Sequence, residues 1–146
     1  MRGLAEVVVD PNVLISALIK QPSNPRAVLD AIGDGELLAV VSPILLGQFD
    51  RAATRNKLRR YFSISEAWAL RGLLEDRGRW YADPPAGVAA IGRDWTDDYL
   101  LRLYRSARAE WIISGDPDVR EYARLPGVVV VNPREAVEEL ERRRYS

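Results

Sequence analysis

Val7-Val8-Val9-Asp10-Pro11-Asn12 is the stretch that decides the fold, because an unbroken apolar run ends there at a carboxylate. Consecutive β-branched residues are typical of a strand buried on both faces, as in a parallel sheet. A second run, Trp111-Ile112-Ile113-Ser114-Gly115-Asp116, ends in the same way. Ligands of open α/β sheets bind beyond the carboxyl ends of the strands. The two aspartates are therefore predicted to meet at one edge of a sheet.

A third pair of acids, Asp97 and Asp98, lies between these two runs at the start of a predicted helix. The buried stripe of that helix is expected to contain Leu100, Leu103 and Tyr104, spaced by three and four residues. Asp97 extends this stripe, whereas Asp98 is rotated from it by about 100°. Asp97 is thus the better candidate to face a site between the strand ends.

Each of these aspartates also has a purely structural interpretation, in which it caps the helix that follows it through backbone N–H groups. Carboxylates gathered at one edge repel each other unless a cation holds them. Hard divalent ions such as Mg²⁺ and Mn²⁺ prefer oxygen ligands. Three acids of this kind, in the order of a βαβ fold, favour a metal-dependent phosphodiester-cleaving site.

The composition removes several other chemistries. The 146 residues include no cysteine and no histidine, which excludes disulfides, Cys/His zinc sites and Ser-His-Asp triads. The net charge is zero, which weakly disfavours a protein that coats nucleic acid without specificity. No apolar run approaches the roughly 20 residues of a membrane span, and the first residues lack the features of a signal peptide. A cytoplasmic location without membrane contact is expected.

Strands and helices are predicted to alternate along the chain, which indicates an α/β fold with a parallel sheet. Ser42-Pro43 is predicted to open one helix, and Ser65, three residues before Trp68, to open another. No internal repeat or long linker divides the sequence. Residues 1–146 are expected to form a single domain.

The motifs together resemble the PIN-domain nucleases, the fold of the toxins in VapBC-type toxin–antitoxin pairs. The resemblance covers residues 5 to about 140 and rests on four short motifs in order. They are Val8-Val9-Asp10-Pro11-Asn12-Val13, Ser42-Pro43-Ile44-Leu45-Leu46-Gly47-Gln48, Arg93-Asp94-Trp95-Thr96-Asp97-Asp98 and Ser114-Gly115-Asp116-Pro117-Asp118.

This resemblance implies a three-layer α/β/α sandwich around a central parallel sheet. It implies a metal-dependent endoribonuclease that cleaves single-stranded RNA, acts as a toxin, and pairs with a cognate antitoxin protein. Asp10, Asp97 and Asp116 match the catalytic acids that hold Mg²⁺ or Mn²⁺. The residues expected to support them are Asn12, Gln48, Asp98, Ser114 and Asp118.

Gln48 is the departure from the family pattern, because the family has a glutamate there. Gln48 is four residues from both Ile44 and Ala52, so it lies at the edge of a buried stripe and can face the cleft. A Gln oxygen can bind a hard cation but brings no charge. Asp50 cannot substitute readily, because two helix positions amount to a rotation of about 200°. Weakened metal binding and weak cleavage are expected, and Gln48→Glu is expected to strengthen both.

Two surfaces are also predicted. The first is a basic cluster that could bind RNA phosphates or simply be a solvated face; it consists of Arg51, Arg55, Lys57, Arg59 and Arg60. The second is a homodimer contact, implied by the family and by Trp68, Leu70, Leu73 and Leu74 on one short helix. The alternative is that all four residues serve the core of one subunit.

Two other functions compete with the ribonuclease. The first is a catalytically impaired PIN domain that binds RNA or a partner protein without cutting, for which Gln48 is the discriminating residue. The second is a phosphoacceptor receiver domain, which also gathers acids at strand ends. That fold needs paired acids early and a lysine after a late strand. Asp10 has no acidic neighbour at positions 11–13 and no lysine follows Lys57, which disfavours it.

Overall fold

Five parallel strands form the sheet in the part of the chain that the structure describes, in the order β3-β2-β1-β4-β5. The computed structural model describes residues 4–83 and 95–145, with side chains from residue 99 onward in the second range. The strands are β1 (Ala5–Val9), β2 (Leu37–Val41), β3 (Arg79–Trp80), β4 (Trp111–Ile113) and β5 (Val130–Val131). The predicted α/β fold with a parallel sheet is confirmed.

Helices connect the strands. They are α1 (Pro11–Ile19), α2 (Asn24–Gly33), α3 (Pro43–Ala53), the 3₁₀ turn η1 (Asn56–Arg60), α4 (Ile64–Arg77), α5 (Trp95–Ala107), α6 (Pro117–Arg120), η2 (Glu121–Arg124) and α7 (Pro133–Arg144). The hydroxyl of Ser42 accepts a hydrogen bond from the Leu45 N–H at the start of α3. None of the helices in the described ranges has the length and apolar content needed to cross a membrane.

The start of α4 differs from the prediction. Ser63, rather than Ser65, caps the helix, and its hydroxyl accepts a hydrogen bond from the N–H of Glu66 at 3.0 Å. The Glu66 carboxylate accepts one in return from the Ser63 N–H at 3.1 Å. This reciprocal capping box needs a Glu or Gln three residues after the serine. Ser65 has Trp68 at that position, so the interpretation of Ser65 as the cap was wrong.

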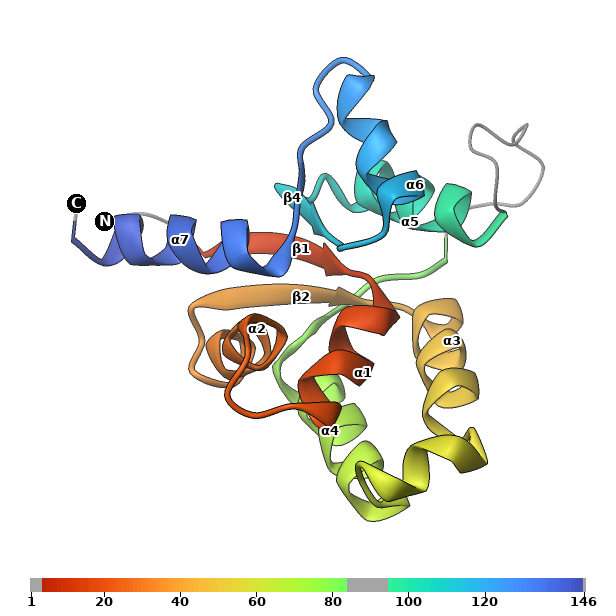
Figure 1. Cartoon of the computed structure of the whole chain (residues 1–146). Coiled ribbons are helices and arrows are strands. Elements are labelled where there is room, and N and C mark those ends of the chain that lie inside the picture. Colours follow the sequence, from red (N-terminus) through yellow and green to blue (C-terminus); the bar gives the residue numbers. More distant parts are fainter. Residues whose placement is uncertain (1–3, 84–94, 146) are drawn as a thin grey trace.

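Helices cover both faces of the sheet, which confirms the three-layer sandwich (Figure 1). Alternate side chains of β1 point to opposite faces, so Val7 and Val9 enter one core and Val8 enters the other. The first core is shared with α1, α2, α4 and α7, and the second with α5, α6 and η2. The buried stripe expected for α5 is present, since Leu100, Leu103 and Tyr104 are all buried.

The strand order places a topological switch point between β1 and β4. From β1 the chain moves outward to β2 and β3, and it then returns to the other side of β1 for β4 and β5. Val9 is in register with Ile113, so β1 and β4 end in step. Ligands of open α/β sheets bind in the crevice that such a reversal opens at the carboxyl edge. Asp10 and Ser114 are the first residues after these two strands.

Candidate metal centre

Asp10 is held at the end of β1 by both neighbouring segments. Its backbone N–H continues the sheet by donating to the Ile113 carbonyl at 2.9 Å. Its Oδ1 accepts a hydrogen bond from the Asn12 N–H at 3.0 Å, which caps α1. Its Oδ2 accepts one from the Ser114 hydroxyl at 2.8 Å. These hydrogen bonds fix the direction of the side chain, and only 5% of the residue is exposed.

Ser114 connects the two strand-end aspartates. It is fully buried, and its N–H donates to the Val131 carbonyl at 2.9 Å. Its hydroxyl donates to Asp10 and accepts a hydrogen bond from the Asp116 N–H at 3.1 Å. Asp116 in turn accepts a hydrogen bond from the Asp118 N–H at 2.9 Å, which caps α6. One small hydroxyl thus sets the spacing between the two carboxylate-bearing turns.

The electrostatics of this pair are unfavourable without a cation. Burial raises the pKa of Asp10 above its usual 3.8, and the negative charge of Asp116 adds to the rise. The hydrogen bonds from the Asn12 N–H and Ser114 lower the pKa but do not outweigh burial. No described basic side chain forms an ion pair with either carboxylate. Two acids kept close together without a counter-charge are typical of a functional site.

A hollow of about 340 Å³ opens beside the two carboxylates. Its lining combines polar groups with two prolines in the first turns of α2 and α7. It consists of Asp10, Asn12, Val13, Ser16, Pro25, Gly115, Asp116 and Pro133. The capping interpretation of Asp10 and Asp116 is correct as far as it goes, because each accepts a backbone N–H. Capping leaves lone pairs on both carboxylates, so it does not compete with cation binding.

Comparison with known proteins identifies the family of this chain. Residues 6–118 match the PIN domain. The chain belongs to the PIN-domain family. An uncharacterized protein of Methanocaldococcus jannaschii, MJ1680, is 28% identical over 145 residues, which cover 94% of this chain and 92% of that protein. A chain in the crystal structure of VapBC2 from Rickettsia felis, bound to a DNA fragment from their promoter, shares the fold. Its TM-score is 0.56 at 12% identity, over 87% of this chain and 98% of that chain.

The motif of residues 93–98 contributes predicted site residues whose side chains lie outside the described part of the structure. Asp97 and Asp98 lie in the first turn of α5, and their side chains are outside the described part of the structure. Arg93 and Asp94 of the same motif also lie outside the described residues. The described residues contain no group of three acids able to hold a metal ion. Asp10 and Asp116 are the members of the predicted triad that the structure brings together.

Gln48 lies on α3, half buried, and does not line the hollow beside Asp10. Its side-chain Oε1 is buried and accepts no hydrogen bond from any described residue. Burying an amide oxygen without a donor costs free energy. Asp50 is committed elsewhere, since Arg71 on α4 donates to its Oδ1 at 2.9 Å. This agrees with the rotation that separates Asp50 from Gln48.

The donor set fits a hard divalent cation. Two carboxylates converge next to Ser114 and line the hollow, which Asn12 and Ser16 also line. All of these are oxygen donors, the ligand type that Mg²⁺ and Mn²⁺ prefer. The Ser114 hydroxyl orients Asp10 in the manner of a residue that supports a metal ligand.

Sequence reasoning missed one buried polar cluster at the start of α3 and α5. The hydroxyl of Tyr99 is hydrogen-bonded to the Ser42 hydroxyl and donates to Asp83 Oδ1 at 2.7 Å. Asp83 also accepts a hydrogen bond from the Ile44 N–H at 3.2 Å. Tyr99 and Ser42 are both fully buried, and burial raises the pKa of Tyr99. This cluster ties the helix that carries Asp97 to the helix that carries Gln48. The only signal in the sequence was the Ser42 cap.

The predicted basic cluster occupies the end of α3 and η1, and its members differ in solvent exposure. Arg51, Arg55, Lys57 and Arg60 are exposed and form no ion pair with described residues. Arg59 is half buried, donates to the Ala53 carbonyl, and lies 5.1 Å from the Phe62 ring centroid. Arg59 therefore closes the end of α3, whereas the other four side chains face solvent.

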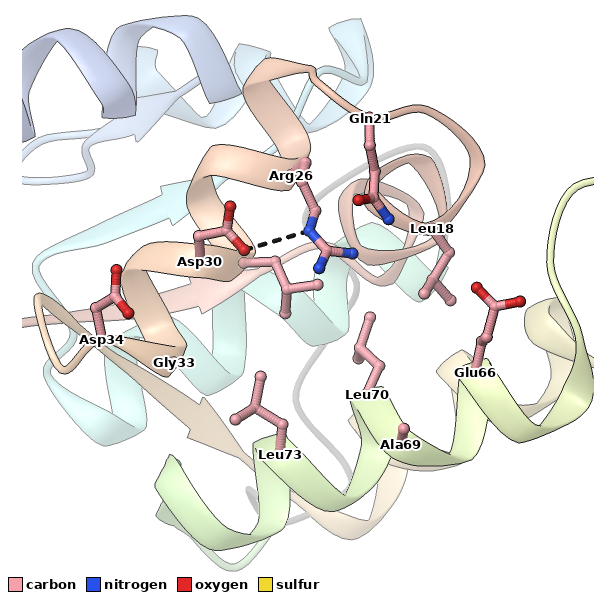
Figure 2. A pocket seen from close by; sticks show the side chains of 11 residues that line it. Leu18, Gln21, Arg26, Asp30, Gly33, Asp34, Glu66, Ala69, Leu70 and Leu73 are labelled. Carbon is pink, nitrogen blue, oxygen red and sulfur yellow. Dashed lines mark hydrogen bonds and ion pairs between the residues drawn. The ribbon is translucent and has the colours of Figure 1, made fainter.

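A second hollow, about 560 Å³, separates α2 from α4 (Figure 2). Leucines form its floor and acids its rim; the lining includes Leu18, Leu29, Leu70, Leu73, Asp30, Asp34 and Glu66. The four side chains expected at a homodimer contact are divided between the core and the surface. Leu70 and Leu74 are buried in the core, Leu73 is half buried in this hollow, and Trp68 is 42% exposed. The alternative of a core role is therefore correct for Leu70 and Leu74.

Proposed function

We propose that this PIN domain is a metal-dependent endoribonuclease that cleaves single-stranded RNA. The observation that carries the proposal is the convergence of Asp10 and Asp116 on Ser114 at the switch point of the sheet. In this proposal Asp10, Asp97 and Asp116 hold Mg²⁺ or Mn²⁺, and the whole of residues 1–146 acts as one domain. Asn12, Asp98 and Asp118 are proposed to support the site.

Four residues of the candidate site have separate roles in this proposal. When bound, the ion lowers the pKa of a water molecule and neutralises charge that develops on the phosphate. Asp10 and Asp116 provide negative charge at a fixed position, and Ser114 keeps the two turns in register. Gln48 provides a neutral oxygen, so one charge fewer attracts the ion than in a PIN domain with glutamate there. Activity is therefore expected to be weak.

A toxin role is the proposed biological setting. Its support is the shared fold with a chain of VapBC2 from Rickettsia felis, together with the family. The partner would be a cognate antitoxin protein, and the place of action would be the cytoplasm, where the RNA is found. A homodimer is proposed as well, now with Trp68 rather than Leu70 or Leu74 at the contact, because Trp68 is the exposed one. Sedimentation that shows only monomer at micromolar concentration would contradict the homodimer.

A second candidate function is a PIN domain that binds RNA or a partner protein without cutting. Gln48 favours it, because the site lacks one of the family's acids and with it a carboxylate able to accept a proton from water. Both candidates predict RNA binding, so binding alone does not separate them.

The deciding experiment is cleavage of a fluorescent single-stranded RNA with Mn²⁺, with EDTA as the metal-free arm. The variants are Asp10→Asn and Asp116→Asn, and the matched control is Asp30→Asn, an exposed acid paired with Arg26 on α2. The ribonuclease proposal expects Mn²⁺-dependent cleavage that both site variants lose and the control keeps. Metal binding without cleavage in the wild type would favour the non-cutting alternative.

A further inference from the structure

Residues 51–61, here called the basic segment, carry five basic residues and no acidic one. They continue from the last turn of α3 through η1 to Tyr61. Neighbouring acids do not neutralise them. Asp50 is engaged by Arg71, and Glu66 accepts the Ser63 N–H that caps α4. The basic segment therefore presents positive charge that the described part of the protein leaves without a counter-ion.

The segment is rigidly built rather than loosely attached. Leu58 and Phe62 are buried and anchor it in the core. Arg59 closes the end of α3 by donating to the Ala53 carbonyl and by packing over Phe62 at 5.1 Å. With these residues turned inward, Arg55, Lys57 and Arg60 are directed to solvent on the same short turn.

An exposed aromatic ring lies next to these cations. Tyr61 is 51% exposed, although a tyrosine gains free energy by burial. The Arg60 guanidinium lies 5.7 Å from the Tyr61 ring centroid, which steadies the ring from one side. A ring held this way offers a flat face to a partner. Aromatic faces beside cations are the usual means by which proteins hold single-stranded nucleic acid, because every base can stack.

The segment lies at the opposite end of α3 from the candidate metal centre. In Figure 1, α3 runs from the carboxyl end of β2 down to η1 at the bottom of the view. The helix has 11 residues, so it carries the chain about 16 Å from that edge of the sheet. An RNA strand that reaches from the cleft to Tyr61 must extend over several nucleotides.

We propose that the basic segment is a second RNA-holding site, at which Arg51, Arg55, Lys57 and Arg60 pair with phosphates and Tyr61 stacks on a base. This inference rests on the proposed function, and it adds that the substrate extends along α3 well beyond the cleaved bond. RNA fits better than an acidic protein segment, because charge alone would explain the cations but would leave the exposed Tyr61 face unused.

The test is binding of a non-cleavable 2′-O-methyl single-stranded RNA of about 12 nucleotides, a length within known single-strand site sizes. Fluorescence anisotropy in EDTA measures affinity without any contribution from the metal centre. The first variant combines Arg55→Gln, Lys57→Gln and Arg60→Gln. The second is Tyr61→Leu, which keeps apolar bulk and removes the ring. The matched control combines Arg105→Gln, Arg108→Gln and Arg124→Gln, three exposed cations over the other face of the sheet.

The triple variant is expected to bind about tenfold more weakly or worse, and to reduce the slope of log affinity against log salt by about 2. Tyr61→Leu is expected to bind about fivefold more weakly while its salt slope stays unchanged, since stacking involves no counterion release. The control should keep wild-type affinity within about twofold. Thermal melting of each variant verifies that the fold is intact.

Wild-type affinity in the triple variant would overturn the second site, and so would an equal loss in the control. Binding of an acidic peptide as tight as that of RNA, with Tyr61→Leu unchanged, would assign the segment to a protein partner instead. Failure here is separable from failure of the proposed function. Cleavage that persists with unchanged binding by the triple variant leaves the nuclease standing without the second site. Binding loss in a protein that never cuts leaves the second site standing without the nuclease.

Discussion

The candidate metal centre and the C-terminal helix use charge in opposite ways. On α7 every arginine of the terminal run has a carboxylate partner: Arg142 binds Glu139, Arg143 binds Glu110 and Glu139, and Arg144 binds Glu36. At the switch point, Asp10 and Asp116 are like charges with no described cationic partner, and one of them is buried. Paired charges stabilise the fold modestly, whereas like charges held together cost stability. We infer from this difference that the α7 arginines serve the structure, whereas Asp10 and Asp116 are held ready to bind a cation.

The largest effect is expected from Asp10→Asn. The substitution should lower Mn²⁺-dependent RNA cleavage by about a hundredfold or more, because the ion contributes several kcal/mol of transition-state stabilisation. The same variant should raise the melting temperature of the metal-free protein at pH 7 by a few degrees, since it removes a buried charge. Lost cleavage together with lost stability would mean that Asp10 is only a helix cap.

The pH dependence of that stability gain follows from the raised pKa of Asp10. In the folded protein, Asp10 holds its proton to higher pH than in the unfolded chain, so its stabilising contribution is full below about 3.8 and is lost as pH rises through the folded pKa. The advantage of Asp10→Asn over the wild type should therefore grow with pH. An advantage that is constant across pH would contradict the assigned cause. Thermal melts of both proteins provide the measurement, from about pH 3, below the usual Asp pKa, to about pH 8, well above it.

The second effect concerns Gln48→Glu, which is proposed to add a negative charge to the candidate metal centre, where Asp10 and Asp116 already repel each other. Metal affinity measured by calorimetry should rise by about tenfold, because a fourth negative charge attracts the ion across a partly dry cleft. Cleavage should become faster, and the metal-free protein should become less stable. Unchanged metal affinity would show that Gln48 does not face the site, and its buried Oε1 would then need another partner.

The third effect is stabilisation by the ion itself. At a Mn²⁺ concentration about 100 times its dissociation constant, the wild type should gain about 2.7 kcal/mol, or a rise in melting temperature of about 5–10 °C. Asp10→Asn and Asp116→Asn should lose most of this rise, whereas Arg144→Gln on α7 should keep it. An equal rise in all of them would place the ion elsewhere on the protein.

The smallest effect is expected from the ion pairs of α7. Arg144 donates to both carboxylate oxygens of Glu36, at 2.6 and 2.7 Å, and this hydrogen bonding lowers the pKa of Glu36 below 4.5. Arg144→Gln should lower the melting temperature at pH 7 by about 2 °C or less. The stabilisation is present above pH 4.5 and is lost as the pH falls through the lowered pKa of Glu36. As the pH rises, the melting temperature of Arg144→Gln should therefore fall relative to the wild type, whereas that of Asp10→Asn should rise. The same trend in both variants would contradict the contrast between the two sites.

Local patterns predicted the fold well. The β-branched run before Asp10, the spacing of Leu100, Leu103 and Tyr104, and the Ser42-Pro43 cap each determine one element through neighbouring residues. The cap of α4 shows how a local rule can fail, because Ser63 has Glu66 three residues later and Ser65 does not. Both candidates were serines, and the partner three residues on decided between them.

Features that depend on distant residues could not be predicted in the same way. Glu36 and Arg144 meet across 108 positions, so nothing local indicated that the terminal arginines are neutralised. The hydroxyl of Ser114 reaches Asp10 across 104 positions. The sequence suggested both residues for one site, but only the sheet order places their strands side by side. Likewise, Trp68 and Leu70 were grouped because both are apolar residues of one helix, and packing separated them into surface and core.

Asp10, Asp97 and Asp116 are proposed to hold one metal ion at the carboxyl edge of the sheet. The most direct test of this proposal is anomalous diffraction from crystals grown with Mn²⁺, with crystals of Asp10→Asn as the comparison. We expect an anomalous peak within coordination distance, about 2.1 Å for ions of this type, of carboxylate oxygens from all three aspartates. We expect that peak to be lost in the variant. Cleavage of RNA under Mn²⁺ conditions in which no peak appears beside Asp10 and Asp116 would contradict it.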